Sequence, residues 1–142
     1  MENQEKDVNT QPKEAPKYDP EELAIIFDDI IFQGYYEEDM KVKGKLQATF
    51  RSRTADLTSQ ISRKLDSSSF NLGSTYIEQR ALWNLASSLV SISGKNLSQL
   101  SLDERFNEIS KLNAQLVSLL SKILVDFDAK IDAACKEGEE NF

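Results

Sequence analysis

The chain has 142 residues, of which 39% are hydrophobic and 29% are charged, and this composition is typical of one globular domain with its own core. The net charge of −7 is unevenly distributed, because residues 1–40 carry three bases and 12 acids whereas residues 41–142 carry 14 bases and 12 acids. A protein that tracks phosphates needs a basic surface, so this balance argues against nucleic acid as a general partner.

The first 18 residues differ in composition from the rest. Val8 and Ala15 are their only aliphatic residues, so they cannot bury enough apolar surface to offset the entropy of ordering. We therefore predict a disordered acidic tail over residues 1–18, a single domain over residues 19–136 and a frayed polar tail over residues 137–142.

A first helix is predicted to begin after Asp19. The Asp19 carboxylate is suited to accept a free backbone N–H at a helix start, and Pro20 fits the first helical position. Two glutamates follow, and their charge suits the positive end of the helix dipole. These signals predict a short helix over residues 20–29.

A β-hairpin is predicted next. Residues 30–36 are rich in β-branched and aromatic side chains, which favours a strand, and the acidic residues 37–39 indicate a turn. Residues 40–53 alternate between apolar and polar positions, as in a half-buried strand. The apolar face of this strand carries Val42, Leu46, Ala48 and Phe50. The opposite face carries the cations Lys41, Lys43, Lys45, Arg51 and Arg53.

The period then changes to that of a helix. Thr54 is placed to cap a helix that presents Leu57, Ile61 and Leu65 at four-residue spacing. Three consecutive serines and a glycine within residues 67–73 indicate a loop.

The next helix is predicted over residues 75–93. Thr75 and Glu78 have the spacing of a capping box at its start, and Gly94 is placed to end it. Residues 95–100 are predicted to form a loop.

Two more helices complete the chain. Ser101 and Glu104 form a second capping box, and Asn113 interrupts the apolar pattern and is predicted to cap a long C-terminal helix. The predicted fold class is therefore α+β and predominantly helical, with an N-terminal β-hairpin followed by about four helices.

Residues for catalysis or metal binding are scarce. The chain has no histidine and a single cysteine, Cys135, which removes the commonest general base and rules out a zinc site built from cysteines. Neighbouring acids such as Asp28 and Asp29, or Asp126 and Asp128, do not face each other on a helix. We therefore expect no catalytic residue, no cofactor, no metal and no enzymatic activity.

The sequence also argues against a membrane partner. No charge-free run is long and apolar enough to span a bilayer, and no secretory signal is visible at the N-terminus. We expect a protein that acts away from membranes.

Three features are candidates for protein binding. The basic face of Lys41, Lys43, Lys45, Arg51 and Arg53 is either a solvated face that discourages edge-to-edge aggregation or a ribbon that docks an acidic surface. Trp83 either packs in the core or anchors an interface, since aromatic residues do both. The apolar stripe of the C-terminal helix is likewise either core or a partner groove.

Three segments of the chain resemble tail assembly chaperones of tailed bacteriophages. The first, KVKGKLQATFRSRTADLTSQI, is similar to a strand that ends in an Arg-Thr turn before a helix. The second, RALWNLASSLVSISGKNL, resembles a helix followed by a SI-x-GK-x-L loop, and the third, ERFNEISKLNAQLVSLLSKILVDFDAKI, resembles a short helix, a break and a long helix. The family often has proline near that break, where this chain has Asn113.

This resemblance implies a non-enzymatic role in the cytoplasm of the infected host. Such chaperones bind tail proteins, including the tape measure protein or baseplate components, and keep them soluble until the tail is built. Homo-oligomerisation is left open.

Other functions are weighed against this one. A structural component of the tail, baseplate or neck shares the resemblance but stays in the virion, so mass spectrometry of purified particles distinguishes the two. A nucleic-acid-binding regulator that uses the basic face is a third interpretation, and the near-neutral body and acidic front argue against it.

Overall fold

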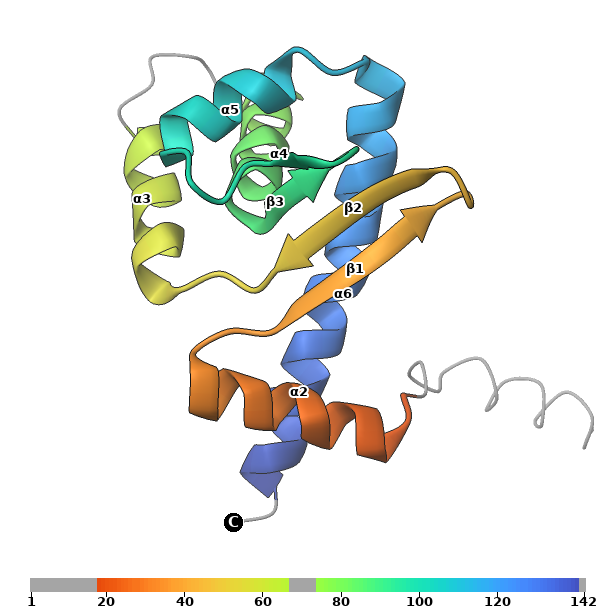
Figure 1. Ribbon diagram of the computed structural model, residues 1–142. Helices are drawn as coiled ribbons and strands as arrows, with labels where there is room; N and C mark the ends of the chain where they lie inside the picture. The colour runs from red at the N-terminus through yellow and green to blue at the C-terminus, as the bar shows by residue number, and fades with distance from the viewer. Residues whose placement is uncertain (1–17, 67–73, 141–142) are drawn as a thin grey trace, which may run out of the picture.

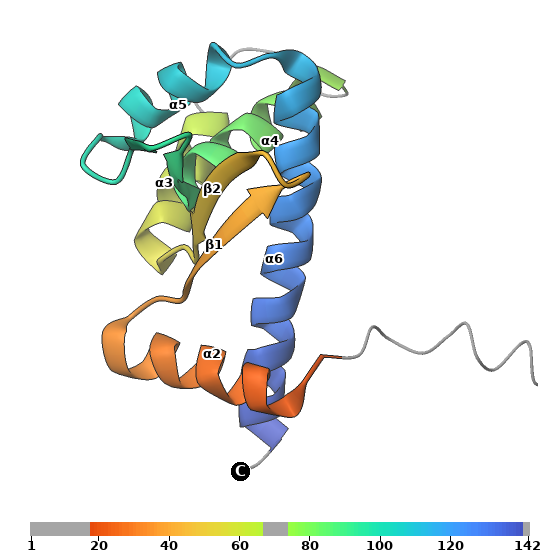
Figure 2. The ribbon, with the colours of Figure 1, turned by 45° about the vertical axis from the view of Figure 1, so that its right-hand side comes forward.

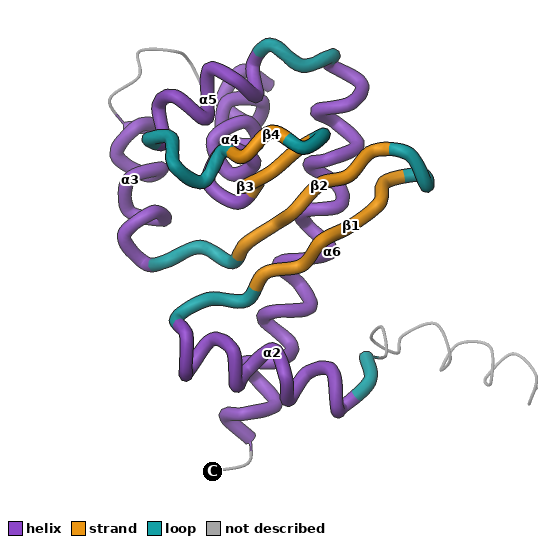
Figure 3. The backbone as a smooth tube through the Cα atoms, in the orientation of Figure 1, coloured by secondary structure: helices purple, strands orange, loops and turns teal. Residues whose placement is uncertain are grey.

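The computed structural model describes residues 18–66 and 74–140 of the chain. In this part the helices are α2 (Pro20–Gln33), α3 (Ala55–Asp66), α4 (Ser74–Ser88), α5 (Leu102–Ser110) and α6 (Ala114–Glu140) (Figure 1). The strands are β1 (Glu37–Val42), β2 (Leu46–Arg51), β3 (Leu89–Ile92) and β4 (Lys95–Asn96) (Figure 3). Helix predominates and the strands form one antiparallel sheet, so the α+β class is confirmed at that level.

Some of the predictions fall on residues outside the described part. These are residues 1–17 of the predicted tail, the loop over residues 67–73, and residues 141–142. Tyr18 is described, and it packs against the buried side chains of α2. Helix α6 reaches Glu140 and so includes the beginning of the predicted C-terminal tail.

The sheet has the order β1-β2-β3-β4, and each neighbouring pair is antiparallel. In the β1–β2 turn, Lys43 and Gly44 have positive φ angles of 55° and 70°, and in the β3–β4 turn Ser93 and Gly94 have 52° and 81°. Positive φ lets a tight hairpin turn match the twist of its strands. Because β2 and β3 are antiparallel neighbours, the two turns lie at the same end of the sheet.

The prediction of a strand over residues 30–36 is wrong over its whole length, because residues 30–33 are helical and residues 34–36 connect α2 to β1. Helix α2 continues to Gln33 and is capped by Gly34, which has a φ of 91°. Ile30 lies one turn after the buried Ile26 and packs in the same apolar cluster beside α6. Helix packing therefore overrides the strand preference of the β-branched residues.

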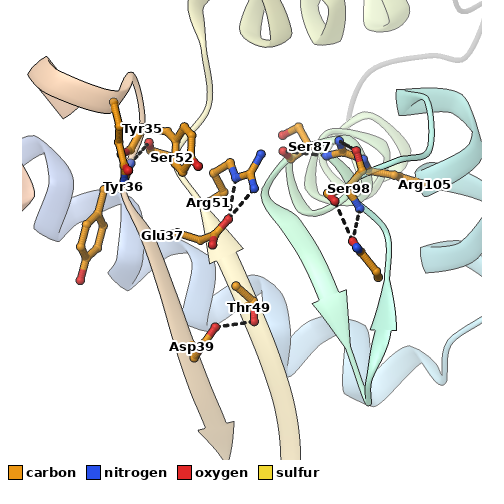
Figure 4. Close-up of polar contacts among 12 residues, drawn as sticks. Tyr35, Tyr36, Glu37, Asp39, Thr49, Arg51, Ser52, Ser87, Ser98 and Arg105 are labelled. Carbon is orange, nitrogen blue, oxygen red and sulfur yellow. Dashed lines mark hydrogen bonds and ion pairs between the residues drawn. The ribbon is translucent and has the colours of Figure 1, made fainter. Parts of the chain in front are cut away.

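The acidic residues predicted to form a turn instead begin β1. Glu37 Oε2 lies 2.6 Å from Arg51 Nη2 on β2, and Asp39 accepts a 2.7 Å hydrogen bond from the Thr49 hydroxyl (Figure 4). Partners on the neighbouring strand thus compensate the repulsion between adjacent carboxylates.

Helix α4 is shorter than the sequence predicts. It begins at Ser74, so Thr75 lies inside the helix, and it ends at Ser88. The residues that follow form a second hairpin, β3 and β4, where the sequence pattern predicts helix and loop. Gly94 lies in the turn of this hairpin and does not end the helix.

Arg105 of α5 stabilises this early helix end. Its guanidinium donates long hydrogen bonds to the carbonyl oxygens of Ala86 (3.5 Å) and Ser87 (3.4 Å) in the last turn of α4, and to that of Ser98 (3.4 Å) (Figure 4). A cation there also suits the negative end of the α4 dipole. Burial, followed by the nearby charge of Arg51, lowers the pKa of Arg105.

Four predicted helix starts are confirmed. The side chain of Asp19 accepts a hydrogen bond of 3.2 Å from the backbone two residues ahead, and Thr54 accepts one of 3.1 Å from three residues ahead. Ser101 and Glu104 make both hydrogen bonds of the capping box. Asn113 accepts from the first turn of α6 at 2.8 and 3.1 Å. The sequence predicts these helix caps correctly because a cap depends on residues only two or three positions apart.

The core lies between the inner face of the sheet and helices α3, α4, α5 and α6, with α6 crossing behind the β1–β2 hairpin (Figures 1 and 2). Phe127 is 2% exposed, and its ring centroid lies 5.8 Å from that of Phe50 and 5.9 Å from that of Tyr36. The apolar face predicted for the hairpin belongs to this core and includes Val42, Leu46, Ala48 and Phe50.

A second, smaller cluster holds α2 against the C-terminal part of α6. Its buried members are Leu23, Ile26 and Ala134. Beside it, Lys130 Nζ lies 2.9 Å from a carboxylate oxygen of Glu22 on α2 and 2.9 Å from one of Glu38 on β1. Lys130 is 16% exposed, so this bridge joins three elements in a partly buried position.

We expect this bridge to make the fold sensitive to alkali. Burial, aided by the charge of Glu38, raises the pKa of Tyr36 to about 12. Burial by itself lowers the pKa of Lys130. The hydrogen bonds to Glu38 and Glu22 raise this pKa by more than burial lowers it, so the pKa lies above its usual value. At a pH between the ordinary pKa of these two groups in the unfolded chain and their raised pKa in the fold, the folded state keeps protons that the unfolded state releases. The free energy of unfolding should therefore fall as pH rises above about 10.

Urea unfolding at several pH values between about 9 and 12 measures this effect. The free energy of unfolding should fall less steeply with pH in Tyr36→Phe and in Lys130→Met than in the wild-type protein. Lys122→Met, which removes an exposed lysine of the same helix, should keep the wild-type slope. Equal slopes for all four proteins would contradict the prediction.

Candidate functional site

The predicted basic face is not one strand face. The turn over residues 43–45 divides the predicted strand of residues 40–53, so Lys43 and Lys45 lie in that turn and Lys41 lies near the end of β1. All three side chains are exposed. They form a group of cations at the turn end of the sheet.

Arg51 lies elsewhere, at the other end of β2. Its Nε and Nη2 atoms contact Glu37 Oε2 at 2.7 and 2.6 Å, and its guanidinium lies 4.4 Å from the ring centroid of Tyr35 (Figure 4). Arg51 is thus paired within the sheet.

Arg53 follows β2 and joins three parts of the fold. It donates a 2.6 Å hydrogen bond to Ser88 Oγ at the end of α4, and its Nη2 lies 2.6 Å from Asp128 Oδ2 on α6. With 18% of its side chain exposed, it offers a partner little surface. Of the neighbouring acids Asp126 and Asp128 that the sequence analysis considered for catalysis, Asp128 is therefore engaged in this ion pair.

Trp83 packs between helices. Its ring stacks on Phe106 of α5 at a centroid distance of 4.0 Å, and Lys64 Nζ of α3 lies 5.5 Å from its ring centroid. The structure therefore does not gather the six predicted residues at one site: three cations lie at the turn end, and the others are engaged in packing or ion pairs.

An extended apolar depression lies between α4 and α6. Near the α5–α6 connection it has a volume of about 600 Å³ and a floor that includes Ala81, Leu82, Ile109 and Val117. A second hollow of about 200 Å³ continues it along the two helices. The two hollows share Ile77, Ala81 and Ser121, so they form one groove.

The edges of the groove carry exposed apolar side chains. Ile77 of α4 and Val125 of α6 are each 66% exposed. Polar residues surround them, namely Glu78, Arg80, Asn84, Ser118 and Asp128. An apolar floor with a polar rim is the arrangement that binds an amphipathic helix.

Ser121 adds a polar group to the floor. Its hydroxyl oxygen is buried and has no hydrogen-bond partner among the described residues. A buried hydroxyl without a partner costs about 1–3 kcal/mol.

The described residues offer little for catalysis. No group of three or more acids and cysteines among them is arranged to hold a metal ion. Cys135 is exposed near the end of α6, and partial burial, followed by the charge of Asp132, raises the pKa of its thiol. A raised pKa keeps the thiol protonated at neutral pH, and the protonated form is a poor nucleophile.

Comparisons with known proteins add no relative. No family model, curated protein or solved structure matches the chain. Within residues 18–66 and 74–140, none of the helices has the length and apolar character needed to cross a membrane. The resemblance to tail assembly chaperones stays a prediction based on the three quoted segments.

The sequence pattern did not reveal the groove. Ile77, Ala81 and Leu85 follow one another at four-residue spacing, which predicts one buried stripe on their helix. In the structure Ile77 is largely exposed. One signal of an exposed apolar surface was present in the sequence. Val125 lies outside the apolar stripe of the C-terminal helix, which includes Leu120 and Phe127. The groove itself depends on how α4 and α6 meet, which no local pattern encodes.

Proposed function

We propose that this protein is a non-enzymatic binding module that holds an amphipathic helix of another polypeptide in the groove between α4 and α6. Following the resemblance stated above, that polypeptide is a phage tail protein of the tape measure type. The module keeps it soluble in the host cytoplasm until the tail is assembled.

The observation that carries this proposal is the continuous apolar groove edged by Ile77 and Val125. An amphipathic helix presents apolar residues every three or four positions, and these fit a groove that runs along two helices. Each large apolar side chain removed from water stabilises such a complex by about 1.5–3 kcal/mol before the costs of association. Covering these residues also protects the partner's apolar stripe from aggregation.

The double variant Ile77→Asp with Val125→Asp tests the groove. Two carboxylates at its edges should weaken binding by about 100-fold or more, because each replaces an apolar contact with a charge that must lose water. The measurement is co-expression with a helical tail protein of the tape measure type, followed by the soluble fraction of that protein and the affinity of the purified pair.

The matched control is Ile25→Asp with Ile31→Asp on α2, which makes the same chemical change at exposed apolar positions away from the groove. We expect this control to keep the tail protein soluble as the wild type does. Unchanged binding by a correctly folded groove variant would contradict the proposal. Turnover of a small molecule that a single carboxylate substitution abolishes would contradict its non-enzymatic part.

A further inference from the structure

Helix α2 presents an acidic and apolar stripe to solvent. Glu21, Ile25, Asp28 and Phe32 follow one another at helical spacing on the side opposite the buried Leu23 and Ile26. Ile25 is 59% exposed and Phe32 is 83% exposed. Helix α2 carries four acids and no base, and only Glu22 among them is paired with a lysine, Lys130, so this surface is negative.

A pocket with the opposite charge lies at the turn end of the sheet. It has a volume of about 420 Å³ and an apolar lining that includes Leu46, Ile92 and Leu116. Lys95 and Lys111 stand at its edge on either side of Glu108, with Nζ to carboxylate distances of 2.6 and 3.7 Å. The three exposed lysines of the β1–β2 turn region lie at the same end of the sheet and add to its positive charge.

The two surfaces cannot meet within one molecule. α2 packs on α6 near Ala134, whereas the pocket includes Leu116 of the same helix. These residues are separated by about 27 Å along the axis at 1.5 Å per residue. Figure 3 shows α2 in the lower part of the molecule and the β3–β4 hairpin in the upper part.

We propose that α2 of one copy docks in the lysine-edged pocket of a second copy. Phe32 enters the apolar pocket, and Asp28 and Asp29 approach Lys95 and Lys111. The contact joins two different surfaces, so it either repeats from copy to copy in rings or short chains or forms twice about a two-fold axis. Each contact is small, and the association is therefore weak and decreases with salt.

Reciprocal charge reversal tests this docking in the full-length protein. By sedimentation velocity, the wild type should form larger species as its concentration rises at low salt. The variant Asp28→Lys with Asp29→Lys and the variant Lys95→Glu with Lys111→Glu should each stay monomeric. Mixing the two variants should restore association, because the new lysines of α2 then meet the new glutamates of the pocket.

Two further variants test the apolar part of this contact and its independence from the groove. Phe32→Ser, which changes no charge, should weaken association by about tenfold. The groove variant Ile77→Asp with Val125→Asp should associate as the wild type does, so failure of one proposal leaves the other standing. Melting temperatures confirm that each variant is folded.

Two outcomes would overturn the inference. One is a wild-type protein that stays monomeric at low salt over the whole concentration range. The other is association that survives in each folded charge-reversal variant, or that does not return when the two are mixed.

Discussion

Phe127→Ala is expected to lower the free energy of unfolding by about 3–5 kcal/mol. The Phe127 ring is almost fully buried between Tyr36 and Phe50, so its removal leaves a cavity where α6 covers the β1–β2 hairpin. A loss of this size is a large part of the total stability of a small domain. Urea or thermal unfolding of the purified variant measures it.

Val125→Ala is the matched control on the same helix. Its side chain is 66% exposed, so its truncation should change stability by no more than about 0.5 kcal/mol. A loss of less than about 1 kcal/mol for Phe127→Ala would mean that α6 does not cover the hairpin as described.

Arg53→Ala is expected to cost about 2–3 kcal/mol, the second largest effect. The substitution leaves Asp128 and the Ser88 hydroxyl without their partner where β2, α4 and α6 meet. The measurement is a double-mutant cycle with Asp128→Ala. The sum of the stability losses of the two single variants should exceed the loss of the double variant.

Arg63→Ala provides the comparison for Arg53, because Arg63 is exposed on α3. It should be nearly neutral. Additive effects of Arg53→Ala and Asp128→Ala would show that the two side chains do not interact in solution. Loss of stability in Arg53→Ala also means that weakened binding by this variant is not proof of a contact with a partner.

The sequence predicts those parts of the fold that depend on neighbouring residues. The caps at Asp19, Thr54, Ser101 and Asn113 are each made within three positions of the chain and were predicted correctly. The strand predicted over residues 30–36 failed because the packing of α2 on α6, which joins residues about 100 positions apart, outweighs local preference.

The hairpin was misplaced for a geometric reason. Val42 and Leu46 face each other across a three-residue turn, so the even-numbered residues stay on the buried face on both sides of it. The alternation of residues 40–53 therefore continues through the turn and has the appearance of one long strand. Only the positive φ preference of Gly44 marked the position where the chain reverses.

The candidate site was the least predictable feature. The basic residues were grouped by alternation, yet Arg51 and Arg53 found partners on other elements and only Lys41, Lys43 and Lys45 stayed together. The α4–α6 groove arises from the angle and spacing of two helices, and neither is encoded in the pattern of one segment.

The separate cluster beneath α2 gives this protein two levels of stability. The cluster of Leu23, Ile26 and Ala134 is small and meets the main core through the partly buried Tyr36 and Ile131. We therefore expect α2 to open more readily than the sheet and the other helices. We expect the Lys130 bridge to set how often this happens, and the backbone amides of α2 to exchange with solvent faster than those of β2. Helix α2 would then be a local folding unit whose opening depends on the C-terminal part of α6.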